Sequence, residues 1–157
     1  MKPSERLNEL SIFLPKPPTP VGAYVPGMRV GDLVYVSGQI PLVDGKVAIT
    51  GKVGADRSLE EAQAAARICA LNALGIAAQV AGGIDNIARI VRLAVFVNSA
   101  PDFTDHPKVA NGASELMLSI FRDAGRHVRA AVGAASLPLD AAVELEMIAE
   151  IGVGGPK

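Results

Sequence analysis

Four segments of the chain carry the alternation or clustering of apolar residues that is typical of β-strands. Tyr24–Pro41 contains LVYVSGQI, which is rich in β-branched and aromatic residues and is bounded by Gly31 and Pro41. Residues 87–98 (IARIVRLAVFVN) have the nearly continuous apolar character of a buried strand. Two further strands are predicted in the last third, over residues 128–137 and 141–151. After the first strand, an Asp44-Gly45 pair between apolar residues predicts a tight hairpin turn.

Two helices are predicted between these strands. Ser58 and Glu61 have the spacing of a capping box, in which each side chain accepts a hydrogen bond from the backbone amide of the other residue. The helix that starts there is expected to end at Gly82-Gly83, because glycine readily adopts the left-handed conformation of a helix C-terminus. A second helix is expected to begin around Pro107 and to end at Gly125.

The order of these elements predicts an α+β fold made of a single domain over residues 1–157. A sheet with the two helices packed on one face allows the apolar sides of both to be buried. The opposite face then needs a cover, which self-association can provide. Residues 1–19 contain LPKPPTP and are expected to form an extended arm, because proline restricts its own backbone and that of the preceding residue. Residues 152–157 are expected to form a disordered tail.

Composition limits the classes of function. The chain is 50% apolar and 20% charged, which is typical of a globular protein. Its formal net charge is −1 without a basic cluster, so nucleic acid is not an expected partner. The single cysteine, Cys69, is expected to be a small buried residue. No continuous apolar run reaches the ~20 residues of a membrane span, and MKPSERLNEL does not resemble a signal peptide. We therefore expect a cytoplasmic protein without a membrane partner.

Candidate chemistry gathers in the last two predicted strands. Alternation puts Glu144 and Glu146 on one face, where such a pair is either the solvated side of a strand or part of a site. Arg129, at the start of the preceding strand, is either surface or a ligand for a carboxylate, which its planar guanidinium can bind with two parallel hydrogen bonds. His106 and His127 are not at metal-ligand spacing, and His127 is interpreted as a surface or loop residue. No metal and no cofactor are expected.

Three blocks of the sequence stand out together: PVGAYVPG at 20–27, LVYVSGQIPL at 33–42 and VRAAVGAASLPLDAAVELEMIA at 128–149. In this combination they resemble the signatures of the RidA-like, YjgF-type family, over residues 20 to about 151. The resemblance implies a chorismate-mutase-like fold assembled as a homotrimer, with clefts between subunits. It also implies the hydrolysis of reactive 2-imino and enamine acids, such as 2-aminoacrylate, to 2-keto acids and ammonia without a cofactor.

The same resemblance implies roles for individual residues. Arg129 matches the arginine that binds the substrate carboxylate, and Glu144 matches the glutamate that positions the attacking water. Tyr24 matches a tyrosine of the cleft. Ser37 and Gly38 match the pair that lines the cleft, where the glycine backbone approaches the ligand.

Three departures from the family pattern leave the substrate and the activity open. Ala131 stands where the family has a cysteine, the region 98–127 is longer than in the archetype, and the N-terminal arm is extra. Three functions follow in order of preference. The first is an imine deaminase, the second is a binder of small carboxylates or 2-keto acids without catalysis, and the third is a ribonuclease, which the acidic isoelectric point opposes.

Overall fold

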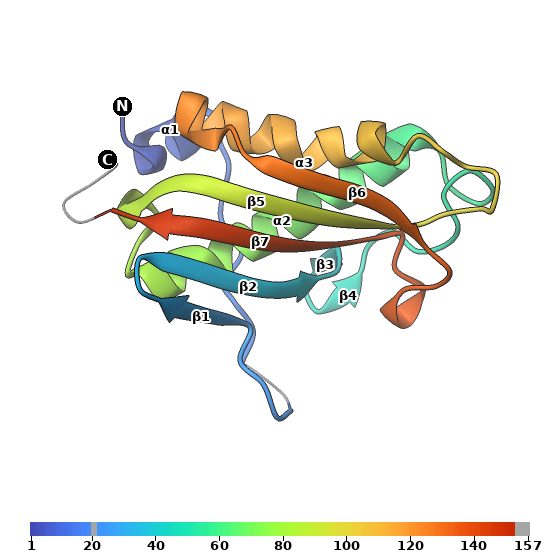
Figure 1. The fold of residues 1–157 in the computed structure, drawn as a ribbon, viewed down its shortest axis with the longest axis horizontal. Coiled ribbons are helices and arrows are strands. Elements are labelled where there is room, and N and C mark those ends of the chain that lie inside the picture. Colours follow the sequence, from blue (N-terminus) through green and yellow to red (C-terminus); the bar gives the residue numbers. More distant parts are fainter. Residues whose placement is uncertain (20–21, 153–157) are drawn as a thin grey trace.

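The computed structural model describes residues 1–19 and 22–152 and shows one main sheet with helices on one of its faces (Figure 1). Its five strands are β1 (Gly27–Val30), β2 (Leu33–Gln39), β5 (Ile87–Asn98), β6 (Val128–Ala134) and β7 (Val143–Ile151). Its α-helices are α1 (Pro3–Glu9), α2 (Leu59–Ala81) and α3 (His106–Phe121). A separate hairpin pairs β3 (Leu42–Val43) with β4 (Lys46–Val47) around the predicted turn, where Asp44 and Gly45 both have positive φ. The predicted α+β class is confirmed.

The strand order in the sheet is β1-β2-β7-β5-β6. All neighbours are antiparallel except β5 and β6, which run parallel because α3 lies between them in the chain. This connection leaves β6 at one edge of the sheet. The predicted strand LVYVSGQI, bounded by Gly31 and Pro41, corresponds to β2. Strand β1 was not predicted separately, and the backbone turns between β1 and β2 at Gly31, where φ is 62°.

Helices α2 and α3 cover one face of the sheet, and the core lies between them and the strands (Figure 1). The side of α2 that faces the sheet is largely alanine, which lets the helix approach closely. Cys69 is fully buried on this side, as predicted, and burial raises the pKa of its thiol. The helix ends at Gly82 in the left-handed conformation, with φ 82°, which also confirms the sequence prediction.

Close contact between α2 and α3 depends on a glycine. A Cβ atom placed on Gly112 would lie 2.2 Å from the carbonyl oxygen of Gln63, so no larger residue fits at this crossing. Helix α3 begins one residue before Pro107 and is followed by a 3-10 turn over Arg122–Gly125, close to the predicted limits.

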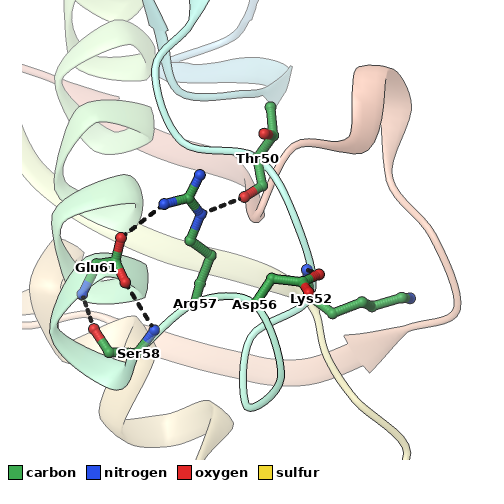
Figure 2. Close-up of polar contacts among 6 residues, drawn as sticks. All are labelled: Thr50, Lys52, Asp56, Arg57, Ser58 and Glu61. Atoms are coloured by element: carbon green, nitrogen blue, oxygen red, sulfur yellow. Dashed lines mark hydrogen bonds and ion pairs between the residues drawn. The ribbon is translucent and has the colours of Figure 1, made fainter.

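A polar loop over residues 50–58 joins the hairpin to α2 (Figure 2). Arg57 Nε donates to the carbonyl oxygen of Thr50 at 2.6 Å, and Arg57 Nη1 donates to the Glu61 carboxylate at 2.9 Å. Ser58 and Glu61 form the predicted capping box, with both reciprocal bonds at 3.1 Å. The hydrogen bond from the Ser58 amide, helped by Arg57, lowers the pKa of Glu61. Arg57 therefore fixes the loop against the first turn of α2.

Residues 1–19 are not an extended arm throughout, because Pro3–Glu9 form α1. Proline at the first position of a helix loses no hydrogen bond, since that amide has no partner within the helix. The backbone amide and hydroxyl of Ser4 both donate to the carboxylate of Asp85, at 2.9 and 2.7 Å. Leu7 packs into the core with only 6% of its surface exposed. These contacts are with distant parts of the chain, so the local proline pattern does not reveal them. The third helix, α1, is thus an addition to the two that were predicted.

Two predictions concern segments at or beyond the limits of the described residues. Gly152 was assigned to a disordered tail, but it is buried and its amide donates to the carbonyl oxygen of Asn86 at 2.9 Å. The remainder of that tail, residues 153–157, and the first two residues of the block 20–27 lie outside the described residues.

Helix α2 is long and apolar enough to cross a membrane by length and composition alone. It contains an 18-residue window with a mean hydropathy of 1.4, a property that a search for continuous apolar runs does not register. In the fold, 56% of this window is buried, and α2 packs against the sheet and α3. Its apolar residues therefore form the core of the domain.

Candidate functional site

Arg129 lies near the start of the edge strand β6, on the side of the sheet that carries the helices. It is paired with Leu93 of β5, which belongs to the buried core, and paired residues on neighbouring strands point to the same face. Arg129 Nη1 donates to Oδ1 of Asn111 at 2.9 Å and to Oγ of Ser114 at 3.1 Å, both on α3. The guanidinium is exposed to solvent, but these two bonds fix its orientation.

Neither Asn111 nor Ser114 was assigned to a site from the sequence. Their three-residue spacing puts them on one face of a helix, which is the only signal available. Their contact with Arg129 depends on how α3 packs against β6, which no local pattern specifies. We call Arg129, Asn111 and Ser114 the arginine half-site.

Glu144 lies on the other face of the sheet and is seated against Gly38. Its neighbours Val143 and Leu145 belong to the core, so the Glu144 side chain points away from the helices. A Cβ atom on Gly38 would lie 2.3 Å from Oε1 of Glu144, closer than such atoms approach in proteins. Glycine at this position therefore makes room for the carboxylate. We call Glu144 and Gly38 the glutamate half-site.

The environment of Glu144 favours its protonated form. Burial raises the pKa of Glu144, and the nearby Glu146, two residues along the same face of β7, raises it further. A carboxylate with a raised pKa is a stronger base than an ordinary one, so it accepts a proton from water more readily. The predicted pairing of the two glutamates on one face is thus confirmed, and it has an electrostatic consequence.

Ser37 holds the segment that carries Tyr24. The amide and the hydroxyl of Ser37 both donate to the carbonyl oxygen of Pro26, at 2.8 and 3.2 Å. The hydroxyl proton of Ser37 is therefore occupied within the protein. Tyr24 precedes β1 and is 65% exposed, next to an open hollow that is also lined by Met28. Within one chain, Tyr24 is at the surface and does not enclose a ligand site.

One chain does not bring Arg129 and Glu144 together. Arg129 points to the helix face and is bonded to α3, whereas Glu144 points to the opposite face and lies against β2. Strand β5 separates β6 from β7, so the two side chains differ both in face and in strand. A single protomer presents two half-sites and not one complete site.

Ala131 follows Arg129 by two residues on the same face of β6 and packs against the core. Its methyl group offers no hydrogen-bond donor or acceptor where the family pattern has a thiol. Across residues 1–19 and 22–152, no group of three or more His, Cys, Asp or Glu side chains is arranged to hold a metal ion.

Comparison with known proteins gives matches along almost the whole chain. A family model described as "YjgF/chorismate mutase-like, putative endoribonuclease" matches residues 4–151. Protein TCP17 of Trypanosoma cruzi is 45% identical over 146 residues, which are 92% of this chain and 91% of that protein. The 2-iminobutanoate/2-iminopropanoate deaminase of Salmonella typhimurium is 33% identical over 133 residues, which are 84% of this chain and 90% of the relative.

The fold is matched as well as the sequence. The crystal structure of Atu1372 from Agrobacterium tumefaciens, a protein with unknown function, has a TM-score of 0.86 and 44% identity, covering 96% of this chain and 93% of that one. The mixed sheet, the helices on one face and the three sequence blocks agree with these matches. This chain belongs to the YjgF/chorismate mutase-like family, the family that its sequence blocks resemble.

Proposed function

We propose that this protein hydrolyses reactive 2-imino acids and their enamine tautomers to 2-keto acids and ammonia. The observation that carries the proposal is the pair of ordered half-sites. Asn111 and Ser114 hold Arg129 by hydrogen bonds, and the absence of a side chain at Gly38 leaves room for the carboxylate of Glu144. The name of the Salmonella relative, a 2-iminobutanoate/2-iminopropanoate deaminase, supports the same reaction class.

In this proposal Arg129 binds the carboxylate that every 2-imino acid carries, through N–H groups that Asn111 and Ser114 do not use. Water adds to the imine carbon, and the electron pair of the C=N bond moves to nitrogen. Loss of ammonia then forms the C=O bond, so that one water is consumed and one ammonia is released. Glu144 takes a proton from the water and returns it to the departing nitrogen. Because an imine is already electrophilic, correct positioning supplies most of the acceleration.

The reaction requires two subunits in this proposal, arranged as a homotrimer with a cleft at each boundary. The arginine and glutamate half-sites face opposite sides of one sheet, so a ligand held by Arg129 meets the Glu144 of a neighbour. The sheet face opposite the helices also exposes large apolar side chains that a neighbour would cover. These are 44–65% exposed in the single chain and comprise Met28, Val30, Tyr35, Val128 and Val132.

A subunit-mixing experiment tests the shared site. Arg129→Ala and Glu144→Gln chains are each expected to lack turnover of iminopyruvate generated in situ. Refolding the two chains together in equal amounts pairs an intact Arg129 with an intact Glu144 at about one boundary in four, so about a quarter of wild-type activity should return. Activity that does not return on mixing, although the mixed oligomers form, would contradict a site shared between chains. Full activity of the Arg129→Ala chain alone would contradict the role of Arg129, and an absence of turnover by the wild-type protein would contradict the reaction itself.

Ala131 favours a second candidate, a binder of small carboxylates or 2-keto acids that does not catalyse. The missing thiol removes a group from the face of β6 that carries Arg129, while the carboxylate anchor remains. Binding of 2-ketobutyrate by calorimetry together with an absence of iminopyruvate turnover would favour this reading over the deaminase. Binding of RNA that weakens steeply with salt would instead favour the nuclease named in the family description.

A further inference from the structure

We infer that His127 is a positioning residue that, by acting through Ser114, determines which edge of the Arg129 guanidinium receives the ligand carboxylate. The inference rests on the proposed function, because it takes Arg129 as the group that binds the carboxylate. It is carried by a chain of hydrogen bonds that begins at the carbonyl oxygen of Gly125 and ends at Arg129.

The direction of each hydrogen bond in this series follows from which atoms can donate and which can only accept. His127 Nδ1 lies 2.6 Å from the carbonyl oxygen of Gly125, and since that oxygen can only accept, Nδ1 carries the proton. In the neutral ring Nε2 is then an acceptor, and it takes the hydroxyl proton of Ser114 at 2.8 Å. The lone pairs of Ser114 are left to accept from Arg129 Nη1 at 3.1 Å. Gly125 thus fixes the ring tautomer, and the ring fixes the serine.

This arrangement leaves one edge of the guanidinium free. Nη1 has two N–H groups, and both are used, one by Ser114 and one by Asn111 at 2.9 Å. No acceptor within the described part of the chain bonds Nε or Nη2 of Arg129. These two nitrogens form a parallel pair of donors that matches the two oxygens of a carboxylate. The ligand is therefore expected to bind side-on to the Nε and Nη2 edge.

The role of His127 depends on its ability to accept at Nε2. Without that acceptor, the Ser114 hydroxyl is free to rotate. Its proton can then face Arg129, where a lone pair of the oxygen faced it before. A donor facing a guanidinium is unfavourable, so Nη1 would turn away and the free edge would no longer be held in one orientation. Ligand binding should weaken more than the chemical step, because Glu144 and the water are not touched.

Two substitutions of His127 separate this role from a general contribution to folding. In His127→Gln the side-chain oxygen can reach the place of Nε2 and accept from Ser114. In His127→Asn the amide can reach the place of Nδ1 and donate to Gly125, but nothing accepts from Ser114. Loss of the hydrogen bond from Ser114 predicts that the KM for iminopyruvate is about fivefold higher in His127→Asn, with kcat nearly unchanged. In His127→Gln, which keeps that bond, both KM and kcat should be near the wild-type values. The Kd of 2-ketobutyrate should follow KM.

Ser114→Ala provides the independent check, and it serves if His127→Asn does not fold. It should raise KM as His127→Asn does. The double variant that carries both substitutions should have no higher KM than Ser114→Ala alone, since both changes interrupt the same series of hydrogen bonds. Equal KM values for His127→Asn and His127→Gln, or additive effects in the double variant, would overturn the inference while leaving the proposed function intact. If Arg129→Ala keeps the wild-type KM and Kd, Arg129 does not bind the carboxylate, so this part of the proposed function fails and the inference fails with it.

Discussion

Replacement of Gly38 by alanine should disable the glutamate half-site without unfolding the protein. The added Cβ would lie 2.3 Å from Oε1 of Glu144, 3.0 Å from Cδ and 3.3 Å from Cγ, and real Cβ contacts essentially never fall below 3.0 Å. Oε1 therefore has to move by at least 0.7 Å, the difference between 3.0 and 2.3 Å. The atom in the way is the far end of a flexible side chain and not backbone, so rotation of the carboxylate relieves the clash.

The two consequences of this rotation differ in size. A side chain forced off its preferred rotamer costs about 1 kcal/mol, which a folded domain tolerates. A displacement on the order of 1 Å in a group that positions a reacting water lowers the rate about 100-fold. The expected result for Gly38→Ala is thus a small decrease in the free energy of unfolding together with a large decrease in kcat/KM.

Iminopyruvate turnover measures the catalytic effect, and urea denaturation measures the effect on stability. Gly45→Ala is the matched control, because Gly45 has φ 79° with no atom within 4 Å of an added Cβ and lies in the β3–β4 hairpin. That backbone strain costs about 1 kcal/mol as well, but it does not touch Glu144. Wild-type kcat/KM in Gly38→Ala, or an equal loss of activity in Gly45→Ala, would refute the assignment of Glu144.

Three further changes test the electrostatics and the packing. Burial and Glu146 raise the pKa of Glu144, so the stability linked to its protonated form is fully present below the unfolded value of 4.5 and is lost as pH rises through the folded value. Glu144→Gln should therefore be more stable than wild type at neutral pH, and the difference in urea midpoint should vanish in acid; an advantage that persists at low pH would contradict this account. Asp85→Ala removes the carboxylate that accepts from Ser4, so the free energy of unfolding should fall by about 1 kcal/mol and the backbone amides of α1 should exchange hydrogen faster. Unchanged exchange rates in α1 would show that this helix docks without Asp85. Gly112→Ala should destabilise the α2–α3 crossing by about 3 kcal/mol, and an unchanged thermal midpoint would mean that the helices separate freely.

The sequence by itself determined the elements whose causes are local. The capping box of Ser58 and Glu61, the left-handed end of α2 at Gly82 and the hairpin turn at Asp44 all depend on residues within a few positions of each other. The alternation of β7 likewise follows from its own composition, which is why the side-by-side placement of Glu144 and Glu146 is correct. The family blocks named the two residues around which the site is proposed.

Tertiary structure decided everything that depends on distant segments meeting. The parallel placement of β6 beside β5 puts Arg129 at an edge, and the packing of α3 supplies Asn111 and Ser114 to hold it. Helix α1 forms within a segment predicted to be extended, because Asp85 and the core stabilise it from far along the chain. The same topology turns Arg129 and Glu144 to opposite faces. Local propensity acts over one or two turns of backbone, whereas a site assembled from strands and a helix depends on contacts that exist only once the core has packed.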